Sequence, residues 1–137
     1  MDGPKLPIAL SLPPLPESVS EARQAVARLA DAAGADRDAV ELAVAEAVGN
    51  AVLHAYRDGR RGTVTVVARH EDDKLVVLVA DDGVGIRPNP AARGIGFGLP
   101  LIAQLSDGLQ ITERAGGGAE LRMRFPAPVR GARGVGQ

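Results

Sequence analysis

Residues Asp38 to Tyr56 read DAVELAVAEAVGNAVLHAY, and this stretch guides the interpretation of the whole chain. Its apolar residues recur with the period of an α-helix and form a wide arc, which predicts a largely buried helix. Three polar residues, Glu46, Asn50 and His54, follow at steps of four and form one stripe along that helix. Because such groups are costly to remove from water, the stripe indicates a binding partner. By itself, the spacing also suits solvated residues with i, i+4 hydrogen bonds.

The composition of the 137 residues favours one domain with a real core. We place it at residues 7–126, between a loose arm at 1–6 and a flexible tail at 127–137. A net charge of -1 gives no electrostatic argument for nucleic acid or for an anionic membrane. The absence of cysteine excludes disulfides and zinc–thiolate sites. With no bilayer-spanning apolar run and no signal-peptide pattern, a cytoplasmic location is expected.

The N-terminal part is expected to supply an edge strand and a first helix. Ile8–Leu12 alternates in strand period between two prolines, which predicts a sheet edge that is open to pairing with another chain. Ser18 and Glu21 have capping-box spacing and indicate a helix that ends at Gly34. Asp36 is then suited to cap the central helix.

Four strands and a third helix are expected after the central helix. Residues 63–70 and 74–80 predict a hairpin, and the second run is apolar almost throughout, which is typical of a central strand. A helix follows, in which Pro100 is acceptable only in the first turn. Residues 109–114 and 120–125 predict strands around a glycine turn. This order predicts an α+β two-layer sandwich, with helices on one face of a mixed, mostly antiparallel sheet.

A second motif, Asp81-Asp82-Gly83-Val84-Gly85-Ile86, directly follows the expected central strand. Asp and Gly are common in ordinary tight turns, so the motif has a purely structural explanation. A carboxylate at Asp81 is also suited to accept a hydrogen bond from an exocyclic amine. Gly83 and Gly85 would let the backbone approach a flat base closely.

A third motif, Gly94-Ile95-Gly96-Phe97-Gly98-Leu99, places three glycines directly before the expected third helix. Free backbone N–H groups and the helix dipole make such a position an anion site. A glycine-rich linker explains the motif less well, because apolar residues alternate with the glycines. The pattern is neither a Walker A motif nor a Rossmann fingerprint, and the motifs of eukaryotic-type protein kinases are absent.

Together and in this order, the three motifs resemble the N, G1 and G2 boxes of the GHKL (Bergerat-fold) ATPases. The segment EAVGNAVLHAY is similar to the helix of the RsbW-like anti-sigma factor serine/threonine kinases, and the resemblance covers roughly residues 7–126. It implies ATP and Mg²⁺ as cofactors, and a sigma factor and an anti-anti-sigma STAS-domain protein as partners. It also implies a homodimer, without direct contact to nucleic acid or membrane.

The resemblance also implies a role for each motif residue. Glu46 would be the general base, Asn50 the Mg²⁺ ligand, and His54 a neighbour of the phosphates. Asp81 would anchor the adenine. The other implied ATP-binding residues are Gly83, Gly85, Ile86, Gly94, Ile95, Gly96, Phe97, Gly98 and Leu99.

The function expected from the resemblance is an anti-sigma factor that is also an ATP-dependent protein serine kinase of the anti-anti-sigma protein. A non-catalytic anti-sigma or partner-switch module stays open, since Gly49 and Ala119 stand where relatives commonly carry Thr. Glu46 argues against that alternative, because pure nucleotide binding needs no base there. A detached histidine-kinase ATP domain is a weaker alternative, since it needs a phospho-acceptor helix and His70 lies in a strand-like run.

Overall fold

The computed structural model describes residues 7–55, 62–83, 95–115 and 117–128. Its elements are β1 (Ile8–Leu12), α1 (Pro16–Ala33), α2 (Arg37–Asn50), η2 (Ala51–Ala55), β2 (Val64–Glu71), β3 (Lys74–Asp81), α3 (Ile95–Leu105), β4 (Gly108–Glu113) and β5 (Ala119–Pro126). No helix in these ranges is long and apolar enough to cross a membrane.

The five strands form one sheet in the order β1-β2-β3-β5-β4. The expected edge strand, the β2–β3 hairpin and the central position of β3 are all confirmed. Every pairing between the described strands is antiparallel. The expectation of a mixed sheet is therefore wrong for this part of the chain, and the expectation of mostly antiparallel pairing is confirmed. The reason is that β3 and β4, which α3 connects, are separated in the sheet by β5.

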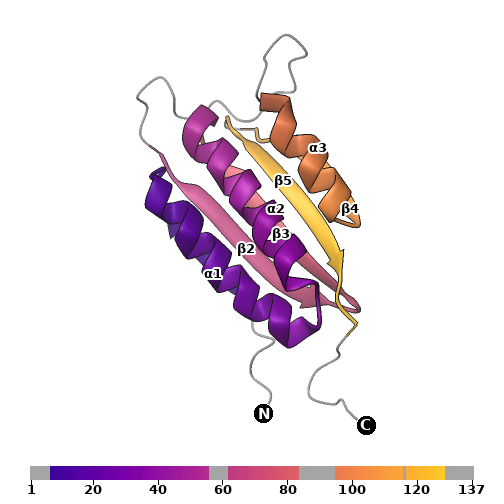
Figure 1. Ribbon diagram of the computed structural model, residues 1–137. Coiled ribbons are helices and arrows are strands. Elements are labelled where there is room, and N and C mark those ends of the chain that lie inside the picture. The colour runs from indigo at the N-terminus through magenta and orange to yellow at the C-terminus, as the bar shows by residue number, and fades with distance from the viewer. Residues whose placement is uncertain (1–6, 56–61, 84–94, 116, 129–137) are drawn as a thin grey trace.

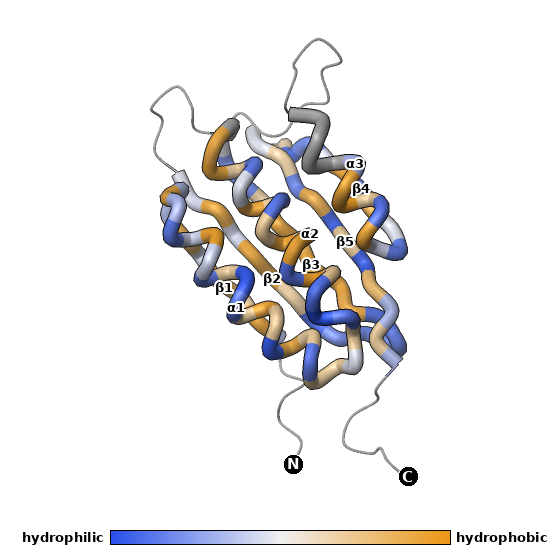
Figure 2. The backbone as a smooth tube through the Cα atoms, in the orientation of Figure 1, coloured by the Kyte–Doolittle hydropathy of each residue, from blue (hydrophilic) through white to orange (hydrophobic). Residues whose placement is uncertain are grey.

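All three helices cover the same face of the sheet, with α2 between α1 and α3 (Figure 1). This arrangement confirms the expected α+β two-layer sandwich. Apolar stretches of the helices and of the central strands supply the core between the layers, while hydrophilic residues interrupt each helix (Figure 2). The core includes the fully buried side chains of Val26, Val44, Val48, Val66, Val77 and Phe125.

The first helix begins two residues before the expected capping box. Pro16 is its first residue, a position that suits the fixed φ of proline. Ser18 is therefore inside the helix, where it is buried and donates a hydrogen bond of 2.6 Å from Oγ to the Pro13 carbonyl. The capping-box prediction is thus wrong, whereas two other boundaries are confirmed. Gly34 ends α1 with φ 77°, and the Asp36 side chain caps α2.

The third helix begins earlier than expected, at Ile95. Pro100 therefore lies inside α3 and not in its first turn, and that expectation is wrong. Pro100 lacks the N–H that would bond the Gly96 carbonyl, and its ring crowds that carbonyl, so this position costs α3 stability. Most of the glycine motif consequently belongs to the helix and does not precede it.

The C-terminal boundary of the core lies beyond the expected one. Ala127, which was assigned to the tail, is fully buried. Its N–H donates to the Asp73 carbonyl at 2.8 Å, and its carbonyl lies 2.8 Å from His70 Nε2. Residues 1–6 and 129–137 lie outside the described residues, so the arm and the rest of the tail stay predictions.

Candidate functional site

Four chain segments meet at one end of the sandwich (Figure 1). They are the C-terminal end of α2, the end of β3, the first turn of α3 and the turn between β4 and β5. The strand register shows why they meet: Asp81 ends β3 opposite Val64, and Ala119 begins β5 opposite Glu113. The three motifs of the sequence therefore converge on the same end of the molecule.

Two residues of the polar stripe lie on the last two turns of α2. Asn50 is buried, with 7% of its surface exposed, and its Nδ2 has no hydrogen-bond partner among the described residues. An unsatisfied buried polar group costs about 1–3 kcal/mol, so a ligand that bonds it would be favoured. Glu46 lies one turn earlier and is half-buried. The Asn50 amide oxygen also fits Mg²⁺, which binds oxygen ligands and keeps much of its coordination for water and phosphate.

The stripe does not continue regularly to His54. After Asn50 the backbone changes to a π-helical turn, η2, which extends from Ala51 to Ala55. Because π-helical turns are wider than α-helical ones, His54 lies at a different angle from the one that a straight α-helix predicts. The structure does not describe the His54 side chain, so its nearness to phosphates stays a prediction. Such π turns frequently occur at functional sites.

Asp81 is the buried carboxylate of the site, with 2% of its surface exposed. Its side chain accepts hydrogen bonds from two backbone N–H groups, that of Gly83 at 3.0 Å and that of Ala119. Removal from water raises the pKa of Asp81, while these two hydrogen bonds oppose the rise. The adjacent Asp82 also raises the pKa of Asp81, and the positive charge of Arg114 lowers it.

The β4–β5 turn lies directly against the backbone of Asp81. Gly118 has φ 92°, and a Cβ atom on it would lie only 2.0 Å from the Asp81 carbonyl oxygen. The same carbonyl accepts a 3.0 Å hydrogen bond from Nη1 of Arg114. The sequence analysis did not identify Arg114. The sequence did offer one signal for it: Arg114 stands just before the glycine turn that leads into β5, the strand that pairs with β3.

The glycine motif supplies the first turn of α3. In an α-helix the N–H groups of the N-cap residue and of the first three helical residues have no partner within the helix, and the three helical ones here belong to Ile95, Gly96 and Phe97. These donors and the helix dipole suit an anion. The side chains of residues 95–99 are not described. Gly85, Ile86 and Gly94 lie outside the described residues.

Gly49 leaves open space on α2. A Cβ atom added there would meet nothing within 4 Å among the described residues, so the glycine is not required by close packing. This residue precedes Asn50 and lies close to the convergent end.

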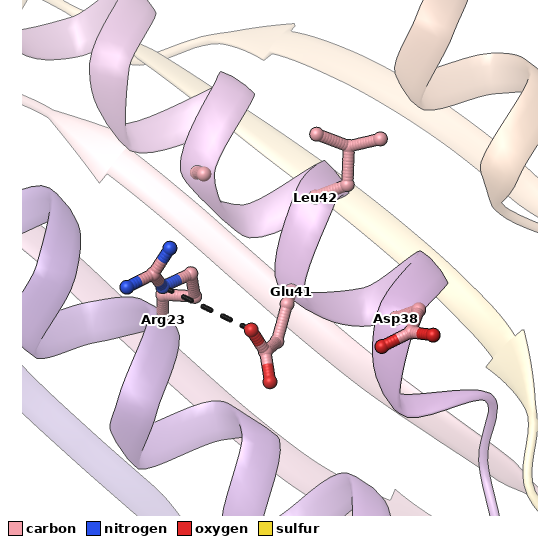
Figure 3. A pocket seen from close by; sticks show the side chains of 5 residues that line it. Arg23, Asp38, Glu41 and Leu42 are labelled. Atoms are coloured by element: carbon pink, nitrogen blue, oxygen red, sulfur yellow. Dashed lines mark ion pairs between the residues drawn. The ribbon is translucent and has the colours of Figure 1, made fainter.

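A shallow hollow of about 180 Å³ lies between α1 and α2, and its lining does not include Asp81 (Figure 3). Arg23 and Glu41 approach across it, with Nε and Oε1 3.9 Å apart, and Leu42 at its rim is 44% exposed. Its volume is below the 300–1,000 Å³ that is typical of small-molecule sites. The hollow is therefore no candidate for the nucleotide site.

Comparison with known proteins agrees with this geometry. Residues 12–125 match the family described as histidine kinase-like ATPase domain. The chain belongs to this family. The match spans both layers of the sandwich and includes every element from α1 to β4.

Within the histidine kinase-like ATPases, the chain is similar to anti-sigma factor kinases. It is 32% identical over 124 residues to the anti-sigma F factor of Clostridium acetobutylicum, covering 79% of this chain and 85% of that protein. It is 30% identical over 127 residues to the serine-protein kinase RsbW of Oceanobacillus iheyensis, covering 80% of each. It is also 40% identical over 79 residues to RsbW of Listeria innocua, covering 56% of this chain and 50% of that protein. The chain is thus an RsbW-like member of the GHKL group.

Proposed function

We propose that this histidine kinase-like ATPase is an anti-sigma factor and an ATP-dependent protein serine kinase. The observation that carries the proposal is the buried Asn50 amide with an unpartnered Nδ2, one turn from the half-buried carboxylate of Glu46. Both lie at the end of the sandwich where Asp81 and the first turn of α3 also lie. Phosphoryl transfer mainly needs positioning, charge neutralisation and a base, and this end offers residue types for each.

The roles of these residues follow from their chemistry. The Asp81 carboxylate would accept a hydrogen bond from the adenine amine, and Gly83 would let the backbone approach the base. The N–H groups of the first turn of α3 would bind the phosphates, together with His54 and Gly94. Gly85 would shape the base pocket with Gly83, and Ile86 would be a further ATP-binding residue. Asn50 would hold Mg²⁺, which neutralises phosphate charge when it is bound.

Glu46 would be the general base of the transfer. Its carboxylate would take the proton of the acceptor serine as the hydroxyl oxygen attacks the γ-phosphate. A residue that only helps to bind nucleotide does not need to be an acid at this position. The half-buried setting of Glu46 leaves part of its surface accessible to a protein substrate.

The proposed sigma-factor partner is supported by the name of one relative, an anti-sigma F factor. The other proposed partners rest on the resemblance of the motifs to the RsbW-like kinases. This chain would bind a sigma factor and keep it inactive in the cytoplasm. It would phosphorylate a serine on an anti-anti-sigma STAS-domain protein, and this would prevent that protein from displacing the sigma factor. A homodimer is proposed, with β1 at its interface.

The test measures phosphate transfer from labelled ATP to a serine of the cognate anti-anti-sigma protein. Glu46→Gln should lower the transfer rate about 10²–10⁴-fold and leave ATP binding intact, because it removes only the base. Asn50→Ala should lose both transfer and Mg²⁺-dependent binding. Glu41→Gln is the matched control, since Glu41 is on the same helix but is paired with Arg37 and Arg23.

The alternative is a binding module without kinase activity. Ala119 favours it, because its side chain offers no hydrogen bond to the neighbouring Asp81. If the wild-type protein binds ATP and a sigma factor but transfers no phosphate to the anti-anti-sigma protein, the alternative replaces the kinase.

A further inference from the structure

The backbone of Asp81 lies at a gap in the sheet. On the β2 side Asp81 is paired with Val64, but on the β5 side the pairing ends at Ala80 and Glu120. Beyond that point no strand residue is paired with Asp81 on that side, and its carbonyl instead accepts the 3.0 Å hydrogen bond from Arg114 Nη1. A side chain thus replaces a sheet hydrogen bond at the residue before the Asp82-Gly83 turn.

Arg114 is itself fixed at both of its backbone groups. Its N–H donates to the Gly118 carbonyl at 3.0 Å, and its carbonyl accepts from the Gly117 N–H at 3.0 Å. Gly118 in turn lies so close to the Asp81 carbonyl that a Cβ atom would not fit. Two backbone hydrogen bonds within the β4–β5 turn therefore fix the position from which Arg114 extends its guanidinium.

We propose that Arg114 is a positioning residue for adenine recognition, holding the Asp81 main chain so that its carboxylate faces the base. This inference rests on the proposed function, in which Asp81 anchors adenine. The side chain of Ala119 is a methyl group, so among the described residues the hydrogen bonds to the Asp81 carboxylate come from the N–H groups of Gly83 and Ala119. Neither of these fixes the Asp81 carbonyl, and Arg114 supplies that restraint.

The charge of Arg114 contributes a second effect. Among the described residues, the charged groups that act on the Asp81 carboxylate are Asp82, which raises its pKa, and Arg114, which lowers it. An ionised carboxylate is the better acceptor for an amine N–H. Arg114 therefore both orients the carboxylate and favours the form that binds adenine.

The experiment measures ATP and GTP dissociation constants by calorimetry, from neutral pH to the acid limit of folding. Arg114→Met should weaken ATP binding about tenfold, the loss expected for one charged hydrogen bond. It should also reduce the ratio between the GTP and ATP dissociation constants. The pH at which ATP binding is lost on acidification should be higher than in the wild type. Arg114→Lys, which keeps the charge, should shift the pH profile less. Arg122→Met, which removes a charge elsewhere in the sheet, should change none of these readouts.

Two further variants make each outcome decisive. Arg114→Gln replaces the methionine variant if circular dichroism shows that the latter is unfolded, and it should show the same shift in pH profile. Unchanged ATP affinity and pH profile in the folded Arg114 variants, with Asp81→Asn impaired, would overturn the role of Arg114 alone. ATP binding by Asp81→Asn equal to that of the wild type would overturn the adenine anchor and this inference with it.

Discussion

Asp81 is an acid in a buried position, and this sets the pH behaviour expected of the site. Burial raises its pKa in the folded protein above the value in the unfolded chain. Between these two values the folded state binds more protons than the unfolded state. Its contribution to the free energy of unfolding therefore falls as the pH rises through that window. With Asp81 as the proposed adenine anchor, ATP binding would need the ionised form and should improve over the same window.

The first prediction compares the wild type with Asp81→Asn, which cannot ionise. In urea denaturation, the stability of the wild type relative to the variant should decrease as the pH rises from below the unfolded pKa through the folded one. Glu71 and Asp107, whose pKa values are lowered by Arg69 and Lys74, behave alike in both proteins and cancel in the difference. A difference that stays constant with pH would show that Asp81 is not perturbed.

Gly49 leads to a second prediction about a single residue. Its added Cβ would meet open space, and glycine is a poor helix former. Gly49→Ala should therefore raise the free energy of unfolding by about 0.5–1 kcal/mol. Gly108→Ala is a useful contrast, because a Cβ there would lie 3.2 Å from Nη2 of Arg124 and should bring no gain. Equal effects of the two substitutions would contradict the argument from space.

Among the elements, the β4–β5 turn has a function beyond joining two strands. It brings Gly118 against the Asp81 carbonyl, Arg114 to the same oxygen, and the N–H of Ala119 to the carboxylate. The turn therefore forms one wall of the site, although it lies more than thirty residues after Asp81 in the chain. A change in the backbone of this turn should therefore alter the position of Asp81.

The third prediction compares two adjacent glycines of this turn. Gly117 and Gly118 both have positive φ, at 108° and 92°, so alanine is strained at either position. At Gly117 a Cβ would lie 3.9 Å from the Gly83 carbonyl oxygen, its nearest neighbour among the described residues, and the cost should be about 1–2 kcal/mol. At Gly118 it would lie 2.0 Å from the Asp81 carbonyl oxygen, so the turn must move away.

Gly118→Ala should therefore cost clearly more stability than Gly117→Ala, about 3 kcal/mol or more from strain and displacement combined. It should also weaken ATP binding, since Asp81 would be displaced with the turn. Urea denaturation and calorimetry measure the two effects. Similar losses for both variants would mean that the turn relaxes without disturbing β3.

For the molecule as a whole, β1 is the feature that bears on assembly. Among the described strands it is an edge strand, paired with β2 on one side. Edge strands present unpaired backbone groups that can bind another chain. A two-fold symmetric pairing would bring the β1 strands of two copies together, so that each residue of β1 lies near β1 of the partner.

The fourth prediction tests the proposed dimer. Light scattering should give the mass of a dimer at micromolar concentration, with a melting temperature that rises with protein concentration. Ser11→Lys, on the exposed face of β1, should favour the monomer because like charges would meet across the interface. Gln24→Lys adds the same charge on α1 and should leave the dimer intact. A monomer at high micromolar concentration would contradict the proposal.

Much of the fold follows from local patterns in the sequence. The alternation of Ile8–Leu12, the cap at Asp36, the αL glycine at Gly34 and the apolar run of β3 are all confirmed, because each depends on neighbouring residues. Helix starts are less local. The helix α1 begins at Pro16, and Ser18 bonds to the Pro13 carbonyl. The start of α1 therefore differs from the one that the capping-box spacing of Ser18 and Glu21 predicts.

The candidate site divides in the same way. The residue types and spacing of Glu46, Asn50 and Asp81 were sufficient to identify the motifs, because charged and amide groups in apolar surroundings are conspicuous in sequence. The π turn after Asn50, the burial of Asp81 and the hydrogen bond from Arg114 were not predictable in this way. The burial of Asp81 and the hydrogen bond from Arg114 depend on which strands are neighbours in the sheet, and local periodicity carries no information about contacts between distant segments.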